Sequence, residues 1–158
     1  MQDFGYLYNW FAVTRGATVS DQSQNHIQGI CPNGWHVPTN SEWVDLTNYV
    51  SKKSQYLCSD NDRNIAKALA STSNWKDCSW LSCAVGNESY TNNATGFSAV
   101  PAGNYGYGNS DDFGSFAYFW SASVDPNESA VALSYMMTYY SPEISQSNYG
   151  KGYGFSTS

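Results

Sequence analysis

The pattern of apolar and polar positions changes from helical spacing early in the chain to short strands later. A nearly continuous, aromatic-rich apolar run over residues 5–13 predicts a first strand, and a polar loop follows to Gly29. After residue 83 the apolar runs are short and are separated by Gly, Asn, Ser and Pro. They predict strands over residues 97–101, 118–122 and 131–137, with Ile144 and Phe155 in two more.

Two helices are expected before this region. Thr39 can cap a helix, and Glu42, three residues later, can complete a capping box. The apolar spacing from Trp43 to Val50 continues that helix on one face. A second helix is predicted over residues 62–71, its start favoured by acidic residues at the helix N-terminus. Two early helices and a loop-rich antiparallel sheet predict an α+β fold.

Composition indicates one folded domain, residues 1–158, with an unusual surface. Hydrophobic residues make up 41% of the 158 residues, which excludes a disordered chain. Charged residues reach only 13%, about half the usual share. The solvated surface must therefore consist largely of Ser, Asn, Thr, Gly and Tyr, which is common for a recognition surface. We expect Trp10, Trp35, Trp43, Trp75, Phe97, Trp120 and Phe155 to form the core.

Charge is concentrated in the second half. Residues 1–76 hold six bases and six acids, whereas residues 77–158 hold seven acids and a single base, Lys151. Phosphate binding requires clustered Lys or Arg side chains, so neither nucleic acid nor an anionic membrane is expected as a partner. The chain has no apolar run of about 18 residues, so no membrane insertion is expected. Its start does not resemble a signal peptide, so we expect either that the sequence is that of the mature domain alone or that export uses another route, such as incorporation into a virion.

Catalytic and metal-binding motifs are poor. There is no G-x-S-x-G, phosphate-binding loop or H-E-x-x-H, and no C-x-x-C spacing. The D-x-D-x-N run from Asp60 lacks the glycine and the final glutamate of a calcium loop. His36 is interpreted as a hydrogen-bonded structural residue, and His26 lies in a polar loop without an evident partner. We therefore expect no enzyme, no cofactor and no metal site. The four cysteines allow three full pairings.

Several motifs together resemble one known family. They are Gly5-Tyr6-Leu7-Tyr8-Asn9-Trp10, Cys31-Pro32-Asn33-Gly34-Trp35-His36-Val37-Pro38 with Glu42-Trp43, Ala66-Lys67-Ala68-Leu69-Ala70-Ser71 with Trp75, Gly96-Phe97-Ser98-Ala99-Val100-Pro101-Ala102-Gly103, Trp120-Ser121-Ala122, and Lys151-Gly152-Tyr153-Gly154-Phe155-Ser156. The chain is similar to the Fibrobacter succinogenes major paralogous domain. That resemblance implies a C-type-lectin-like fold with two helices, adjacent termini and a loop-dominated ligand face. Several members look like variable proteins of diversity-generating retroelements, including viral ones from archaea and phage.

The resemblance also bears on the cysteines and on the sheet. Family members usually continue past the Gly-Phe-Ser motif to a second cysteine, so Cys31 is expected to be free here. Cys58 and Cys83 are then the favoured disulfide. Alignment with the family implies that Met137, Tyr139 and Ile144 face inward.

Residues 103–156 are the expected variable, ligand-binding region. Residues 103–158 contain eight tyrosines and eleven serines, the mixture that antibody paratopes use. One wall of the expected face comprises Tyr105, Tyr107, Asp112, Phe116 and Tyr118, and the other Ser134, Tyr135, Met136, Thr138, Tyr140, Glu143, Ser145 and Tyr149. Replacing Tyr135 and Tyr140 by alanine is expected to abolish binding without lowering stability.

The function implied is a non-catalytic receptor-binding or adhesion protein, exposed on a cell surface or virion or otherwise extracellular. Its partner would be a surface protein of a host or neighbouring cell, or a glycan. An alternative reading is an invariant structural or carbohydrate-binding surface domain. A third is an enzyme of the formylglycine-generating type, for which Cys78 and Cys83 would supply the reactive pair.

Overall fold

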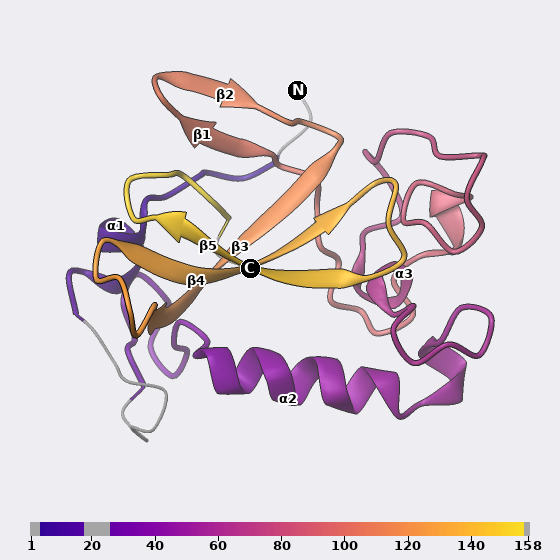
Figure 1. Ribbon diagram of the computed structural model, residues 1–158, viewed down its shortest axis with the longest axis horizontal. Helices are drawn as coiled ribbons and strands as arrows, with labels where there is room; N and C mark the ends of the chain where they lie inside the picture. Colours follow the sequence, from indigo (N-terminus) through magenta and orange to yellow (C-terminus); the bar gives the residue numbers. More distant parts are fainter. Residues whose placement is uncertain (1–3, 18–25, 157–158) are drawn as a thin grey trace.

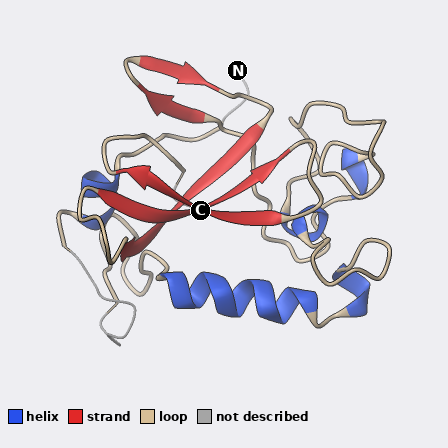
Figure 2. Cartoon of the chain, in the orientation of Figure 1, coloured by secondary structure: helices blue, strands red, loops and turns tan. Residues whose placement is uncertain are grey.

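The computed structural model describes residues 4–17 and 26–156 (Figures 1 and 2). Its helices are α1 (Trp10–Thr14), α2 (Asn40–Ser51) and α3 (Ala66–Leu69), with short 3₁₀ helices η1 (Ser54–Tyr56) and η2 (Ser89–Thr91). Its strands are β1 (Asn104–Gly106), β2 (Asn109–Asp111), β3 (Phe116–Val124), β4 (Val131–Thr138) and β5 (Ile144–Gly150). Within the described ranges they form a β1–β2 hairpin and a β3–β4–β5 sheet, both antiparallel. The expected α+β class is confirmed.

Helix α2 begins as the sequence predicts. The Thr39 hydroxyl accepts from the Glu42 N–H at 3.3 Å, and the Glu42 carboxylate accepts from the Thr39 N–H at 2.8 Å, which completes the capping box. Trp43 and Val50 are its buried residues. Figure 1 shows α2 along one side of the three-stranded sheet, with the β1–β2 hairpin on the opposite side.

The register of the three-stranded sheet decides which side chains share a face. Tyr118 lies opposite Met136, which lies opposite Ser145. Because side chains alternate along a strand, these three face one way and their chain neighbours face the other. Nearly every residue of β3 is buried, so this sheet is covered on both faces.

Two hydrophobic cores fill the two sides. The first lies between α2 and the sheet, where Trp43 packs on Phe119 and Tyr135, and it also includes Met137. The second lies on the opposite face around Trp10, Trp120 and Phe155. In the second core the Trp120 and Phe155 rings stack at 4.4 Å, and the Trp120 indole N–H donates to the Tyr8 carbonyl at 2.9 Å. The sheet is therefore held rigidly from both sides.

The predicted strand over residues 5–13 is wrong. Only Tyr8 pairs as a strand residue, through an antiparallel bridge to Phe155, and α1 begins directly after it. Asn9 caps that helix, because its side chain accepts from the Ala12 N–H at 2.8 Å. The bridge places segments near the two ends of the chain side by side. Of the polar loop expected to end at Gly29, residues 18–25 lie outside the described residues.

Two further predicted elements are shorter than expected. The helix over 62–71 is limited to α3, and its N-cap, Ile65, makes no side-chain cap hydrogen bond. Residues 97–101 form no strand, although Ala99 makes a single bridge to Ala70. The positive φ of Ser98 interrupts extended structure there. The strands over 118–122 and 131–137 and around Ile144 are present as β3, β4 and β5.

Most of the predicted core residues are buried, and Trp35 is the exception. Trp10, Trp43, Trp75, Trp120 and Phe155 are buried, and Phe97 is half-buried. Trp35 is 71% exposed and directly follows a turn at Asn33 and Gly34, where the Trp35 N–H donates to the Pro32 carbonyl at 3.0 Å and Gly34 has a φ of +87°.

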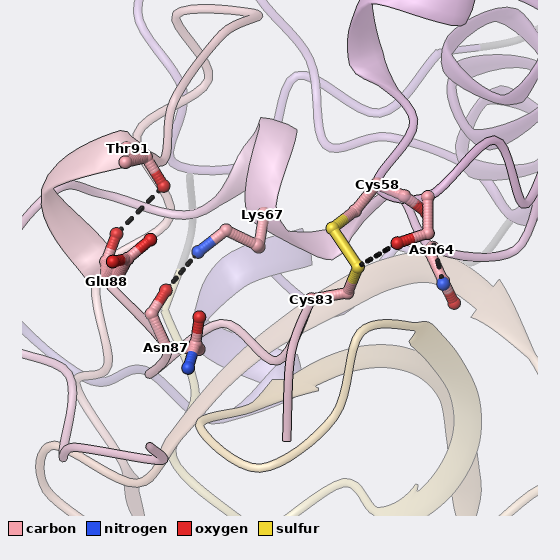
Figure 3. The surroundings of a disulfide bond; sticks show 8 residues. Cys58, Asn64, Lys67, Cys83, Asn87, Glu88 and Thr91 are labelled. Atoms are coloured by element: carbon pink, nitrogen blue, oxygen red, sulfur yellow. Dashed lines mark hydrogen bonds between the residues drawn. A yellow bond between two sulfur atoms is a disulfide. The ribbon is translucent and has the colours of Figure 1, made fainter. Parts of the chain in front are cut away.

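The structure joins Cys58 and Cys83 by a disulfide bond, the pair that the sequence favoured (Figure 3). The bond links the loop after η1 to the segment before η2, and Asn64 donates to the Cys58 carbonyl at 3.3 Å. Cys31 and Cys78 are free. Burial raises the pKa of the Cys78 thiol, which argues against a reactive Cys78–Cys83 pair. Across the described ranges, no helix is long and apolar enough to cross a membrane.

Candidate ligand-binding face

A continuous series of aromatic rings crosses the sheet face that carries the second core and continues beyond the end of β4 to Tyr139, which packs against the first core, and to Trp80. Neighbouring ring centroids lie 5.1–6.2 Å apart along the whole series. We call this series the aromatic row; in spatial order it comprises Trp80, Tyr139, Tyr140, Phe116, Tyr118, Tyr149, Tyr153 and Tyr107. Such contacts hold the rings in fixed orientations, since offset and edge-to-face aromatic pairs are favourable.

The middle of the row is built on strand alternation. Phe116 and Tyr118 are two residues apart on β3, so they share a face, and their rings stack at 5.5 Å with an interplanar angle of 8°. Tyr118 also stacks on Phe155 at 4.8 Å. Tyr149, from β5, meets both Tyr118 and Phe155 edge-on. The inner rings of the row are thus packed directly on the second core.

One end of the row is presented by the β1–β2 hairpin. Its two turn residues, Tyr107 and Gly108, both have positive φ, the pattern of a type I′ turn. Tyr107 is 93% exposed at the tip, and its ring meets Tyr153 edge-on at 5.7 Å. Tyr153 packs over Gly106, where an added Cβ would come within 2.5 Å of the ring. Glycine at position 106 therefore allows the hairpin to lie against the row.

A carboxylate lies beside the inner rings. One oxygen of Asp112 accepts from the Asn104 side chain at 2.8 Å and from the Tyr118 hydroxyl at 3.4 Å. Burial raises the pKa of Tyr118, and the nearby Tyr149 and Asp112 raise it further. The phenol therefore stays protonated at neutral pH and donates to the Asp112 carboxylate.

The single base in residues 77–158 is used inside the protein. Lys151 is buried, with its ammonium 4.4 Å from the centroid of the Trp10 ring and 2.6 Å from the Ser129 carbonyl to which it donates. The Lys151 ammonium therefore interacts with the Trp10 ring and the Ser129 carbonyl, and it does not neutralise the negative charge of Asp112. Aromatic faces and a carboxylate are groups that attract cations.

The structure brings together most, but not all, of the predicted site residues. Those on the face of the aromatic row and at least partly accessible are Tyr107, Asp112, Phe116, Met136, Tyr140, Ser145 and Tyr149. Tyr118, Ser134 and Thr138 lie on the same face but are buried, so the prediction that they are exposed is wrong. Of the three residues implied to face inward, Met137 is buried, and Tyr139 and Ile144 are half-buried against the first core.

Tyr105 lies on the reverse side of the hairpin. Its neighbours Asn104 and Gly106 face Asp112 and Tyr153, so alternation turns Tyr105 away from the row. An added Cβ on Gly154 would contact Tyr105, which confirms that direction. Tyr105 is thus removed from the candidate face.

Tyr135 and Glu143 also lie elsewhere. Tyr135 is 4% exposed and stacks on Trp43 in the first core, on the face opposite the row. Glu143 forms an ion pair with Arg63 at 3.0 Å. Tyr135, Glu143 and Arg63 all line a groove of about 360 Å³ between α2 and β5. The expectation that Tyr135 can be replaced without loss of stability is therefore wrong.

Sequence reasoning missed four members of this site. Tyr153, Asn104, Tyr139 and Trp80 contribute to the row or to Asp112 but were not among the candidates. The pair Gly106 and Tyr153 could have signalled contact, since a glycine in a short strand often marks close approach. Trp80 lies 59 residues before Tyr139, and no local pattern connects them.

The fold and this face define an α+β domain with an aromatic, acidic surface on a rigid sheet. The sequence model of the Fibrobacter succinogenes major domain matches residues 1–157, so the chain belongs to that family. Neither the curated proteins nor the solved structures contain a significant match.

Proposed function

We propose that the protein is a non-catalytic binding module and that the aromatic row is its contact surface. The observation that carries this proposal is the row itself: eight rings in unbroken contact, running from exposed Trp80 to exposed Tyr107. Interfaces are enriched in Tyr and Trp because these side chains supply large contact area at a small cost in conformational entropy.

Rigidity of the row supports a binding role. Tyr118 and Tyr149 are fixed by Phe155 from below, and the sheet backbone is held by both cores. A partner would therefore meet side chains that are already ordered, which lowers the entropic cost of association. Two exposed rings of the row, Tyr107 and Tyr140, can change identity without disturbing either core.

The negative charge near the aromatic row favours a partner with basic side chains. Asp112 lies among aromatic faces, and residues 77–158 carry seven acids against one base. A Lys or Arg side chain of a partner could lie over a ring and pair with this carboxylate at the same time. The favoured partner is a protein on a host or neighbouring cell that exposes a basic patch; a glycan is the alternative.

The finer classification is part of the same proposal. The family resemblance supports a C-type-lectin-like scaffold and a role as a variable protein of a diversity-generating retroelement, carried by a virus of archaea or bacteria and displayed on a virion or cell surface. Variation would then fall on accessible positions of the row and its neighbours, among them Tyr107, Tyr140 and Ser145. The genomic locus tests this: a near-copy of the 3′ end differing only at adenines, beside a reverse transcriptase, is expected.

Binding is tested with the fluorescently labelled chain on intact candidate host cells, measured by flow cytometry. The face variant Tyr107→Ser/Tyr140→Ser should weaken binding by at least about tenfold, since exposed aromatic anchors carry most of an interface's energy. The matched control Tyr6→Ser/Tyr90→Ser removes two exposed tyrosines outside the row and should bind like the wild type. Equal binding by both variants would place the site elsewhere, and competition by free monosaccharides would favour the glycan.

A further inference from the structure

Both histidines of the chain lie side by side at the start of α2. Ile27 and Val37 form an antiparallel bridge in which the Val37 N–H donates to the Ile27 carbonyl at 2.8 Å. These two side chains are buried, so strand alternation turns the preceding residues, His26 and His36, to the opposite side. Their ring centroids are 4.0 Å apart.

Glu42, in the first turn of α2, adds a carboxylate to this pair. Its Oε1 lies 2.7 Å from His36 Nε2 and 3.7 Å from His26 Nδ1. The three potential ligand atoms all lie within 4.8 Å of one another. The other carboxylate oxygen, Oε2, accepts from the Thr39 N–H at 2.8 Å and from the Thr39 hydroxyl at 3.0 Å. The capping box therefore fixes the carboxylate so that Oε1 points at the imidazoles.

These distances fit a small tetrahedral site. With metal–ligand bonds of about 2.0–2.1 Å, neighbouring ligand atoms in a tetrahedral zinc site lie roughly 3.3–3.5 Å apart. The 2.7 Å and 3.7 Å separations around Glu42 Oε1 bracket that value. The two imidazole nitrogens lie within 4.8 Å of each other, and side-chain rotation would bring them to the ligand spacing. Imidazole nitrogen and carboxylate oxygen suit zinc, whereas calcium and magnesium prefer oxygen ligands alone.

The capping box alone does not account for the whole arrangement. The capping box requires Thr39 and Glu42 but neither histidine. The hydrogen bond to Glu42 accounts for the position of His36 but not for that of His26. His26 is a second nitrogen donor, half-exposed, with its Nδ1 toward the same oxygen.

We propose that His26 Nδ1, His36 Nε2 and Glu42 Oε1 form a zinc-binding site whose fourth position is open to water or to an exogenous ligand. Two histidines and one glutamate with an open position form a ligand set that zinc uses in proteins. The hydrogen bonds from Thr39 orient the Glu42 carboxylate, as hydrogen bonds to metal-binding side chains do in other proteins. The site shares no residue with the aromatic row and does not depend on the proposed binding function.

The test uses the full chain without a polyhistidine tag, stripped with EDTA and titrated with ZnCl₂ by isothermal titration calorimetry. We expect one site per chain with a Kd in the micromolar range or below. His26→Ala and His36→Ala should each weaken binding by about tenfold or more. At ~100 µM zinc the melting temperature of the wild type should rise by roughly 5–10 °C, and that of His26→Ala should not.

Cys31→Ser is the matched control, because Cys31 is a free thiol in the loop that carries His36. This variant should bind zinc like the wild type. Cobalt in place of zinc should give visible d–d absorption without a thiolate-to-metal charge-transfer band. Absence of binding by the wild type at ~100 µM zinc overturns the proposal, as does unchanged binding by His26→Ala or loss of binding in Cys31→Ser. Urea unfolding in EDTA checks that His26→Ala, an exposed change, folds normally.

Discussion

Replacement of Tyr135 by alanine tests the assignment of this residue to the first core instead of the binding face. Its ring is buried and stacks on Trp43 with centroids 4.8 Å apart at 18°. Its hydroxyl donates to the Asn40 side chain at 2.8 Å, which links β4 to the first residue of α2. The substitution would remove the ring contact and the hydrogen bond together.

The expected loss can be worked out from these contacts. Truncation of a buried large aromatic residue to alanine costs about 3–5 kcal/mol. Loss of the hydroxyl alone, in Tyr135→Phe, should cost about 1 kcal/mol. Tyr140→Ala should cost less than about 1 kcal/mol, because this ring is half-exposed at the surface.

Urea unfolding at pH 7 with the disulfide intact provides the measurement. With an m-value of about 2 kcal/mol/M, Tyr135→Ala should lower the midpoint by about 2 M, and Tyr140→Ala by less than about 0.5 M. Tyr135→Phe remains measurable even if the alanine variant fails to fold. If Tyr135→Ala shifts the midpoint no more than Tyr140→Ala, the ring does not support the first core and the assignment is refuted.

Two further predictions concern the hairpin and the capping box. Tyr107→Asn should leave stability unchanged or raise it by about 0.5–1 kcal/mol in urea unfolding, because asparagine suits a positive φ better than tyrosine. Tyr105→Asn, in the neighbouring strand, should instead lower stability. A loss of stability in both variants would contradict the turn geometry. Burial raises the pKa of Glu42, but hydrogen bonds from Thr39 and His36 outweigh it, so the pKa lies below its ordinary value. A lowered pKa stabilises the fold above the unfolded-state pKa, so Glu42→Gln in EDTA should cost about 1 kcal/mol at pH 7. This difference from the wild type should vanish as the pH falls through the folded-state pKa, and a difference that persists at pH 2 would show that the charge plays no part.

Local signals in the sequence predicted part of this structure correctly. The capping box that starts α2 depends on two residues three positions apart, and both hydrogen bonds are present. Strands β3 and β4 follow from apolar runs that contain β-branched and aromatic residues. These features involve neighbours in sequence, so no tertiary information is needed to find them.

Features that depend on tertiary contacts were harder to predict. Along β4, Tyr135 and Met136 face different cores, but β3 and β4 are covered on both faces, so the polar–apolar alternation that normally marks the exposed face is missing. The side of the hairpin on which Tyr105 lies depends on the packing of Tyr153 over Gly106, a contact between residues far apart in sequence. His26 was left without a partner because its position beside Glu42 depends on the Ile27–Val37 bridge, which no local pattern in the sequence indicates.

The pairing of Tyr8 with Phe155 also determines how the domain would respond to tension. Each of these residues donates its backbone N–H to the carbonyl of the other, at 2.8 and 3.0 Å, in an antiparallel arrangement. A force that pulls the two segments apart acts on these backbone hydrogen bonds one after another. It does not act on all of them at once, as a force parallel to the strands would. Phe155 would leave the second core first and uncover Trp120. A domain stretched between these two segments is therefore mechanically weak, whereas one anchored through a single segment and loaded at the aromatic row keeps this pairing free of strain.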